Sequence, residues 1–164
     1  MGCIRRNHSR FHVILPAVSS KHVCFLAHGQ EFAAPVDAVL ETTPLRPLTR
    51  VFHVEPFIAG VMSLRGEIVA VLDLGLFLGL GPTNLASGVV LVRAGRRRAG
   101  LLAERLSEVR ELGDDAIGPV PQLVPDDQAP FFRGVASLPH GPVVVLDLER
   151  IFADERVRRY ERRA

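Results

Sequence analysis

Features that usually mark enzymes or membrane proteins are scarce in this chain of 164 residues. It contains no Trp, one Tyr and two Cys, and no apolar run reaches the roughly 18 residues that cross a bilayer. Cys3 and Cys24 imply no disulfide framework, which favours a reducing compartment. The sequence therefore predicts a soluble cytoplasmic protein that does not insert into a membrane.

Motifs for catalysis are also missing. The chain has no phosphate-binding loop and no Gly-x-Ser-x-Gly nucleophile turn, and no His lies at metal-ligand spacing within an ordered segment. The paired acids Asp114–Asp115 and Asp126–Asp127 lie in Gly- and Pro-rich stretches, which is typical of solvated turns. We expect no catalytic residue, no metal site and no cofactor, and hence a protein that is not an enzyme.

The net charge of +2 hides an uneven distribution. Residues 1–21 carry four basic side chains and no acid, and residues 155–164 carry five Arg and two Glu, which leaves −5 for residues 22–154. We expect residues 1–21 to form a disordered basic tail. A nucleic-acid binder concentrates positive charge on its folded surface, so no nucleic-acid partner is expected. The remote alternative, a small β-barrel that binds nucleic acid, rests on Arg96–Arg98 and the two basic ends.

An internal repeat organises the chain. Gly60–Leu64 returns as Gly134–Leu138 and Val71–Leu74 returns as Val145–Leu148, both at an offset of 74 residues. A weaker similarity relates the segments before them: Gly29 matches Gly95, Ala33 matches Ala99, and after a one-residue slip Asp37, Val39 and Glu41 match Glu104, Leu106 and Glu108. The pattern predicts two related lobes, at about 22–84 and 85–153.

The segments within each lobe are short, rich in Val and Leu, and separated by Gly or Pro, which indicates four or five strands per lobe. Short strands leave sheet edges exposed unless the sheet curls into a barrel, so two small barrels with a groove between them are expected. A helix follows each set of strands, and Asp73 and Asp147 are placed to cap its N-terminus. Apolar periodicity ends at Asp154, which predicts that residues 154–164 are a charged helix end.

One pair of opposite charges is a candidate structural contact. Arg65 follows the apolar Leu64 and Glu41 ends a strand-like stretch. A partly buried Arg usually requires a carboxylate partner because its desolvation is costly. We expect Glu41 and Arg65 to pair across the first lobe, while two independently exposed charges remain the alternative.

The run Pro56–Gly66, followed by Leu72-Asp73-Leu74, and the later Gly134-Val135-Ala136 and Leu146-Asp147-Leu148 are similar to the CheW-like domain, the family of chemotaxis coupling proteins, over residues 22–153. Ser63 and Ala70 stand where the family often has Asn and Pro, which leaves the class of receptor open.

The resemblance implies a mainly β fold of two intertwined, five-stranded SH3-like barrels with short helices and a C-terminal helix. It implies a non-catalytic adaptor, recruited to membrane receptor arrays, that joins the cytoplasmic tip of a methyl-accepting chemoreceptor to the regulatory domain of a CheA-type histidine kinase. Receptor-coupling positions of the family fall on Val39, Gly60 and Arg65, and the Glu41–Arg65 pair corresponds to a family salt bridge. No short motif marks the kinase contact. A scaffold of a chemosensory pathway that controls surface motility or gene expression remains the alternative.

Overall fold

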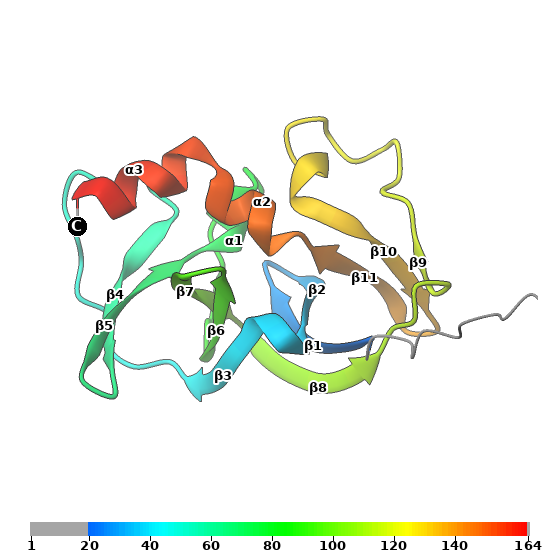
Figure 1. Ribbon diagram of the computed structural model, residues 1–164, viewed down its shortest axis with the longest axis horizontal. Coiled ribbons are helices and arrows are strands. Elements are labelled where there is room, and N and C mark those ends of the chain that lie inside the picture. Colours follow the sequence, from blue (N-terminus) through cyan, green and yellow to red (C-terminus); the bar gives the residue numbers. More distant parts are fainter. Residues whose placement is uncertain (1–19, 164) are drawn as a thin grey trace, which may run out of the picture.

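Two β-lobes lie side by side in the computed structural model, which describes residues 20–163 (Figure 1). Lobe 1 is a five-stranded sheet in the order β3-β6-β7-β5-β4, and lobe 2 is a six-stranded sheet in the order β8-β1-β2-β11-β10-β9. The strands of lobe 1 are β3 (Val39–Pro44), β4 (Ile58–Leu64), β5 (Glu67–Leu72), β6 (Gly88–Ala94) and β7 (Arg97–Ala103). Those of lobe 2 are β1 (Lys21–Ala27), β2 (Gln30–Pro35), β8 (Arg105–Glu111), β9 (Ile117–Gly118), β10 (Phe132–Leu138) and β11 (Gly141–Leu146).

Short helices connect and cover the sheets. They are the 3₁₀ turns η1 (Val36–Ala38) and η2 (Ala129–Phe131) and the helices α1 (Leu74–Phe77), α2 (Leu148–Ala153) and α3 (Glu155–Arg163). The predicted mainly β fold with two SH3-like lobes is confirmed, and the sixth strand of lobe 2 is a two-residue addition at its edge.

The lobes do not coincide with the two sequence repeats. The hairpin β1–β2 comes from the first repeat but lies in lobe 2, where Ala33 of β2 pairs in parallel with Val145 of β11. The hairpin β6–β7 comes from the second repeat but lies in lobe 1, where Gly100 pairs in parallel with Val71. The expectation of contiguous lobes at 22–84 and 85–153 is therefore corrected, because each repeat gives its first hairpin to the other sheet.

These pairings also correct the alignment of the two hairpins. The turn His28–Gly29 lies between paired Ala27 and Gln30, and the turn Gly95–Arg96 lies between paired Ala94 and Arg97, so the hairpins repeat at an offset of 67 throughout. The expected matches of Gly29 with Gly95 and of Ala33 with Ala99 are one residue out of register. The two turns place glycine differently: both central residues of the first have positive φ (48° and 70°), as type I′ requires, whereas in the second only Gly95 does.

The exchanged hairpins are buried on both faces. On β1, Phe25 packs into a central core between the lobes while its neighbour Cys24 packs into the core of lobe 2. On β6, Val90 faces the central core and Val89 the core of lobe 1. This double burial explains the unbroken apolar runs Val23–Ala27 and Val89–Val92 in these hairpins. Because both lobes contribute to the central core, they form one packed body.

The charged C-terminal segment is a separate helix and not an extension of α2. The backbone leaves the helical region at Asp154 (φ −58°, ψ 133°), and α3 then begins at Glu155. Val157 of α3 is buried in the central core, and the Arg156 guanidinium lies 4.6 Å from the centre of the Phe77 ring. The predicted charged helix end is therefore anchored by one buried side chain, Val157. This apolar residue did not stand out among the charged residues of the sequence.

The predicted basic tail lies outside the described residues, except for its last two positions. Ser20 accepts a hydrogen bond at its carbonyl from the Leu112 amide (2.9 Å), and Lys21 already belongs to β1. Strand β1 therefore begins at Lys21, one residue before the expected start of the domain at residue 22.

Candidate protein-binding groove

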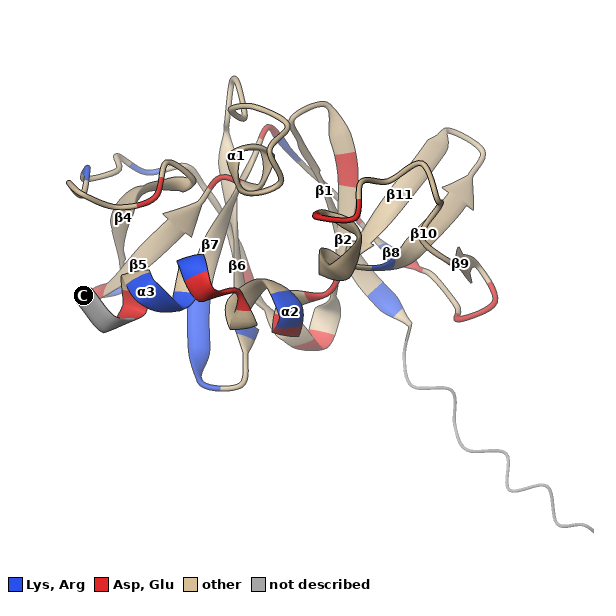
Figure 2. Ribbon diagram, turned by 90° about the horizontal axis from the view of Figure 1, so that it is seen from above, with Lys and Arg blue, Asp and Glu red and all other residues tan. Residues whose placement is uncertain are grey.

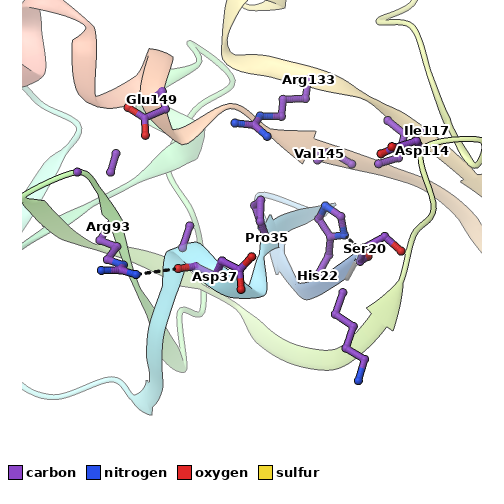
Figure 3. A pocket seen from close by; sticks show the side chains of 14 residues that line it. Ser20, His22, Pro35, Asp37, Arg93, Asp114, Ile117, Arg133, Val145 and Glu149 are labelled. Carbon is purple, nitrogen blue, oxygen red and sulfur yellow. Dashed lines mark hydrogen bonds between the residues drawn. The ribbon is translucent and has the colours of Figure 1, made fainter. Parts of the chain in front are cut away.

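A groove of about 770 Å³ lies between the two lobes (Figure 3). Its walls come from the start of β1, the end of β2, η1, the β6–β7 turn, β10, β11 and the first turn of α2. Both lobes therefore contribute, as expected from two barrels packed side by side.

Opposite charges are balanced around this groove. It is lined by three basic and three acidic side chains: Lys21, Arg93, Arg133, Asp37, Asp114 and Glu149. Arg93 donates a hydrogen bond from Nη2 to the backbone carbonyl of Asp37 (3.4 Å), and none of the six forms an ion pair with another residue of the described range 20–163. A surface of this kind suits a protein partner that carries both signs of charge better than it suits a phosphate group.

The predicted Glu41–Arg65 contact is present, at the outer end of lobe 1. Arg65 Nε lies 3.4 Å from Glu41 Oε2, and the side chains are 80% and 27% exposed. Arg65 (φ 52°) and Gly66 (φ 81°) form the turn between β4 and β5, both with the positive φ of a type I′ turn. The expectation that Arg65 is partly buried is wrong, because the turn projects it into solvent. A pair this exposed stabilises the fold by only about 0–1 kcal/mol.

Gly60, also predicted to couple to a receptor, lies in the interior of lobe 1. It is buried with φ 150°, and a Cβ built on it would lie 2.7 Å from the carbonyl oxygen of Thr49, whose backbone bridges to Val61. Gly60 therefore presents no side chain to a partner. Its absent side chain leaves room for the backbone of Thr49 to cross β4.

Val39 begins β3 directly after η1 and is half-buried against the central core. Its neighbour Ala38 lines the groove. Of the three residues predicted to couple to a receptor, Val39 adjoins the groove, Gly60 is interior, and Arg65 lies at the β4–β5 turn outside the groove lining. Through its contact with Glu41, Arg65 lies against β3, the strand that Val39 begins.

Comparison with known proteins decides the family. A family model described as "CheW-like domain" matches residues 21–156. The chain belongs to the CheW-like domain family. It is 29% identical over 134 residues to a protein named "Probable chemotaxis protein CheW" from Rhizobium etli, with 80% of this chain and 86% of that protein covered. It is 26% identical over 135 residues to "Chemotaxis protein CheW" from Rhizobium meliloti, with 81% and 87% covered.

A solved structure agrees with the fold of this CheW-like domain. The crystal structure of scaffolding protein TtCheW from Thermoanaerobacter tengcongensis superimposes with a TM-score of 0.73 at 24% identity, covering 84% of this chain and 95% of the other. At this level of identity the likeness concerns the fold.

Asp73 and Asp147 occupy equivalent places in the two halves of the CheW-like domain and cap α1 and α2. Asp73 Oδ1 accepts from the Leu76 amide (3.3 Å) and from Thr83 Oγ1 (2.7 Å), and its Oδ2 accepts from the Thr83 amide (2.9 Å). Asp147 Oδ1 accepts from the Arg150 amide alone (3.1 Å). Asp73 thus caps its helix and also holds the loop that follows it.

Arg97 of the β6–β7 hairpin contacts both C-terminal helices. Arg97 Nη1 donates to the carbonyl of Phe152 (2.6 Å), and its Nε lies 3.2 Å from Glu161 Oε2 on α3. Arg98 pairs with Glu67 at 2.6 Å. Figure 2 shows this basic hairpin beside the charged helix α3. Two of the three arginines that favoured a nucleic-acid partner therefore already have carboxylate partners.

A polar cluster in lobe 2 of the CheW-like domain was not predicted. Glu31 on β2 is 14% exposed, and its carboxylate lies 3.4 Å from Arg110 Nη2 and 3.0 Å from His140 Nε2. Arg110 also contacts His140 directly and reaches Glu108 at 3.7 Å. These residues are far apart in the sequence, so no local spacing marks them.

Cys24 lies near this cluster, fully buried. Burial, and after it the Glu31 carboxylate, raise the pKa of the Cys24 thiol to about 11, while the Arg110 guanidinium opposes the change. A thiol of this kind is protonated and unreactive at neutral pH.

No cluster of three or more His, Cys, Asp or Glu side chains arranged to hold a metal ion is found among residues 20–163. Over the same range, no helix is long and apolar enough to cross a membrane.

Proposed function

We propose that this CheW-like domain is a non-catalytic adaptor that couples the cytoplasmic tip of a chemoreceptor to a CheA-type histidine kinase in chemotaxis signalling. The observation that carries the proposal is the groove built from both lobes on one shared core, in a family whose relatives are named chemotaxis proteins. The adaptor reaches the membrane only through the receptor.

The groove is the proposed receptor site. Its walls come from both lobes and its charges are balanced, which supports an occupant that carries both acidic and basic side chains. Val39 lies beside this groove, so a larger side chain there disturbs its rim.

The kinase is proposed to bind an end of lobe 1. Ile68 on β5, beside the β4–β5 turn, is 77% exposed. Large apolar side chains at such exposure are common at protein interfaces. Arg65, two residues before β5, lies at the same hairpin as Ile68 and is positioned to affect this contact.

The shared core supplies the mechanical link between the two proposed sites. Phe25 and Phe32 of lobe 2 and Val90 of lobe 1 pack into the same central cluster. Because packed cores transmit displacement, an adaptor of this kind holds receptor and kinase in one geometry and lets a small receptor movement bias the kinase between its active and inactive states.

The test is receptor-dependent kinase stimulation, reconstituted with the full chain, a receptor cytoplasmic fragment and the kinase. We expect stimulation only when the chain is present, and a several-fold loss for Arg65→Ala at an unchanged melting temperature. Arg159→Ala, which removes the exposed Arg159–Glu155 pair of α3, is the matched control and should retain stimulation. Absence of stimulation by the wild-type chain contradicts the adaptor role, and full stimulation by Arg65→Ala contradicts the role of the β4–β5 turn.

A further inference from the structure

Strand β8 forms one edge of lobe 2 and also supports the groove. Among the strands of residues 20–163 it is hydrogen-bonded only to β1, with His22 opposite Arg110 and Lys21 opposite Glu111. Just beyond the strand, the Leu112 amide donates to the Ser20 carbonyl (2.9 Å). Ser20, Lys21 and His22 line the groove, so the end of β8 fixes one of its walls.

The side chain of Arg110 ties this edge strand to the rest of the barrel. Its guanidinium reaches Glu31 on β2 (3.4 Å) and contacts His140 in the β10–β11 turn, and His140 lies 3.0 Å from the same Glu31 carboxylate. Neither β2 nor the β10–β11 hairpin is a backbone neighbour of β8 in the sheet. The three side chains therefore close lobe 2 at a place where backbone hydrogen bonds do not.

Within the described residues, the equivalent end of lobe 1 has no half-buried cluster of this kind. At the offsets of 67 and 74 residues, Glu108 and the β10–β11 turn of lobe 2 correspond to Glu41 and the β4–β5 turn of lobe 1. Lobe 1 is closed there by two separate pairs, Glu41–Arg65 and Glu67–Arg98, whose side chains are up to 80% exposed. In lobe 2, Glu31 and Arg110 are 14% and 22% exposed, so solvent screens their attraction less.

We propose that Arg110 is a positioning residue for the groove: through Glu31 and His140 it holds the end of β8, and hence residues 20–22, in the arrangement that a partner meets. The identity of that partner rests on the proposed adaptor function. The positioning itself does not, because it concerns the mobility of the groove wall in the chain alone. Removing one partner of a half-buried charge cluster leaves the others uncompensated, so the loss of Arg110 should loosen this wall.

Hydrogen–deuterium exchange of the full chain tests the positioning directly. For Arg110→Met we expect amide exchange at least tenfold faster over residues 20–22 and 105–112, with β4 and β5 of lobe 1 unchanged. Arg110→Lys keeps one charged contact and should restore most of the protection. The matched control Arg98→Met removes an arginine from the exposed pair of lobe 1 and should leave the groove wall unchanged.

Affinity separates positioning from general stability. At a temperature where every variant is fully folded, Arg110→Met should weaken binding of a receptor cytoplasmic fragment several-fold, while Arg110→Lys and Arg98→Met bind like wild type. If Arg110→Met does not fold, His140→Gln removes one arm of the cluster and takes its place in both measurements, with a smaller expected effect.

Unchanged exchange at the groove wall, or equal acceleration in both lobes, overturns the proposal. Accelerated exchange with unchanged affinity also overturns it, because the wall then does not govern binding. Failure of the wild-type chain to bind the receptor fragment refutes the proposed function instead, and the exchange data still decide whether Arg110 positions the wall.

Discussion

The two lobes share one topology and are stabilised by opposite means. The core of lobe 1 is built from large aliphatic side chains: Met62, Leu64, Val69, Val71, Val89, Leu91 and Leu102. The core of lobe 2 uses mostly smaller ones: Cys24, Ala33, Leu112, Ala136, Val143 and Val145. The ion pairs at the ends of the lobes show the opposite trend in burial: they are exposed in lobe 1 and half-buried in lobe 2.

The two halves of the duplication therefore differ in the interactions that stabilise them. Lobe 1 gains its stability from apolar burial, so its terminal ion pair Glu41–Arg65 is free to remain in solvent. Lobe 2 has less apolar volume and relies on the Glu31–Arg110–His140 cluster to close its sheet. The glycines common to both halves, Gly60 and Gly134, mark what the topology itself requires.

The largest effect is expected from giving lobe 1 the core of lobe 2. Met62 corresponds to Ala136 and is 2% exposed, so Met62→Ala should lower the free energy of unfolding by about 2–5 kcal/mol, through lost burial and a new cavity. The reverse change, Ala136→Met, should cost about 1–3 kcal/mol by overpacking. Denaturant unfolding measures both, and a cost below about 1 kcal/mol for Met62→Ala would show that lobe 1 does not depend on its large side chains.

The shared glycines offer a second test. A Cβ on Gly134 would lie 2.3 Å from the carbonyl oxygen of Gly118, so Gly134→Ala should displace β9 and cost about 1–3 kcal/mol. Gly60→Ala should cost at least as much, because its φ of 150° adds backbone strain to the close approach of Thr49. Gly29→Ala is a control with open space around its Cβ but with positive φ, which isolates the strain. If Gly134→Ala is tolerated without loss, the crossing at β9 is not a structural requirement.

The pH dependence of stability should distinguish the two cores, because only that of lobe 2 contains a thiol. The folded pKa of Cys24, about 11, exceeds the ordinary value of 9.0, so the protonated thiol favours the folded state. Its contribution is complete below pH 9 and is lost as the pH rises toward 11, an effect of about 2–3 kcal/mol. Cys24→Ala should abolish this part of the alkaline loss, and Leu91, at the equivalent place in lobe 1, contributes none. Identical pH profiles of unfolding free energy for wild type and Cys24→Ala would contradict this contribution of the thiol.

The smallest effect on stability is expected at the exposed pair. Glu41→Gln should change the free energy of unfolding by less than about 1 kcal/mol, because Arg65 is 80% exposed. Glu31→Gln, which uncouples the half-buried cluster of lobe 2, should cost more, about 1–3 kcal/mol. Both variants change Glu to Gln, so thermal unfolding compares the two lobes directly. An equal loss of stability would contradict the claim that the polar contacts of lobe 2 contribute more than those of lobe 1.

Much of the fold was predictable from the sequence because it is local or repeated. Short apolar segments predicted the strands, and the 74-residue offset predicted the duplication. The exchange of hairpins was not evident from the repeat, because parallel pairing of Ala33 with Val145 joins residues more than 100 positions apart, and nothing local specifies it. The register of the hairpins was misjudged because glycine takes the second turn position at Gly29 but the first at Gly95.

The candidate site was predicted less completely. Glu41 and Arg65 were identified, but Arg65 is exposed, because its turn geometry and not its apolar neighbours decides where it points. Gly60 was predicted to couple to a receptor and is interior, so that role stays a prediction. The Glu31–Arg110–His140 cluster was missed, since its members come from three distant strands and turns. The sequence already matched Glu41 with Glu108, but nothing in that match indicated that Arg110 and His140 lie beside Glu108.

The central claim is the proposal that this CheW-like chain holds a receptor and a kinase at the same time. Analytical ultracentrifugation of the full chain with a receptor cytoplasmic fragment and the kinase tests it most directly. The account predicts that kinase sediments with the receptor fragment only when the chain is present, in a complex that contains all three. Kinase and receptor that each bind the chain but exclude one another, or that associate equally well without it, would contradict the claim.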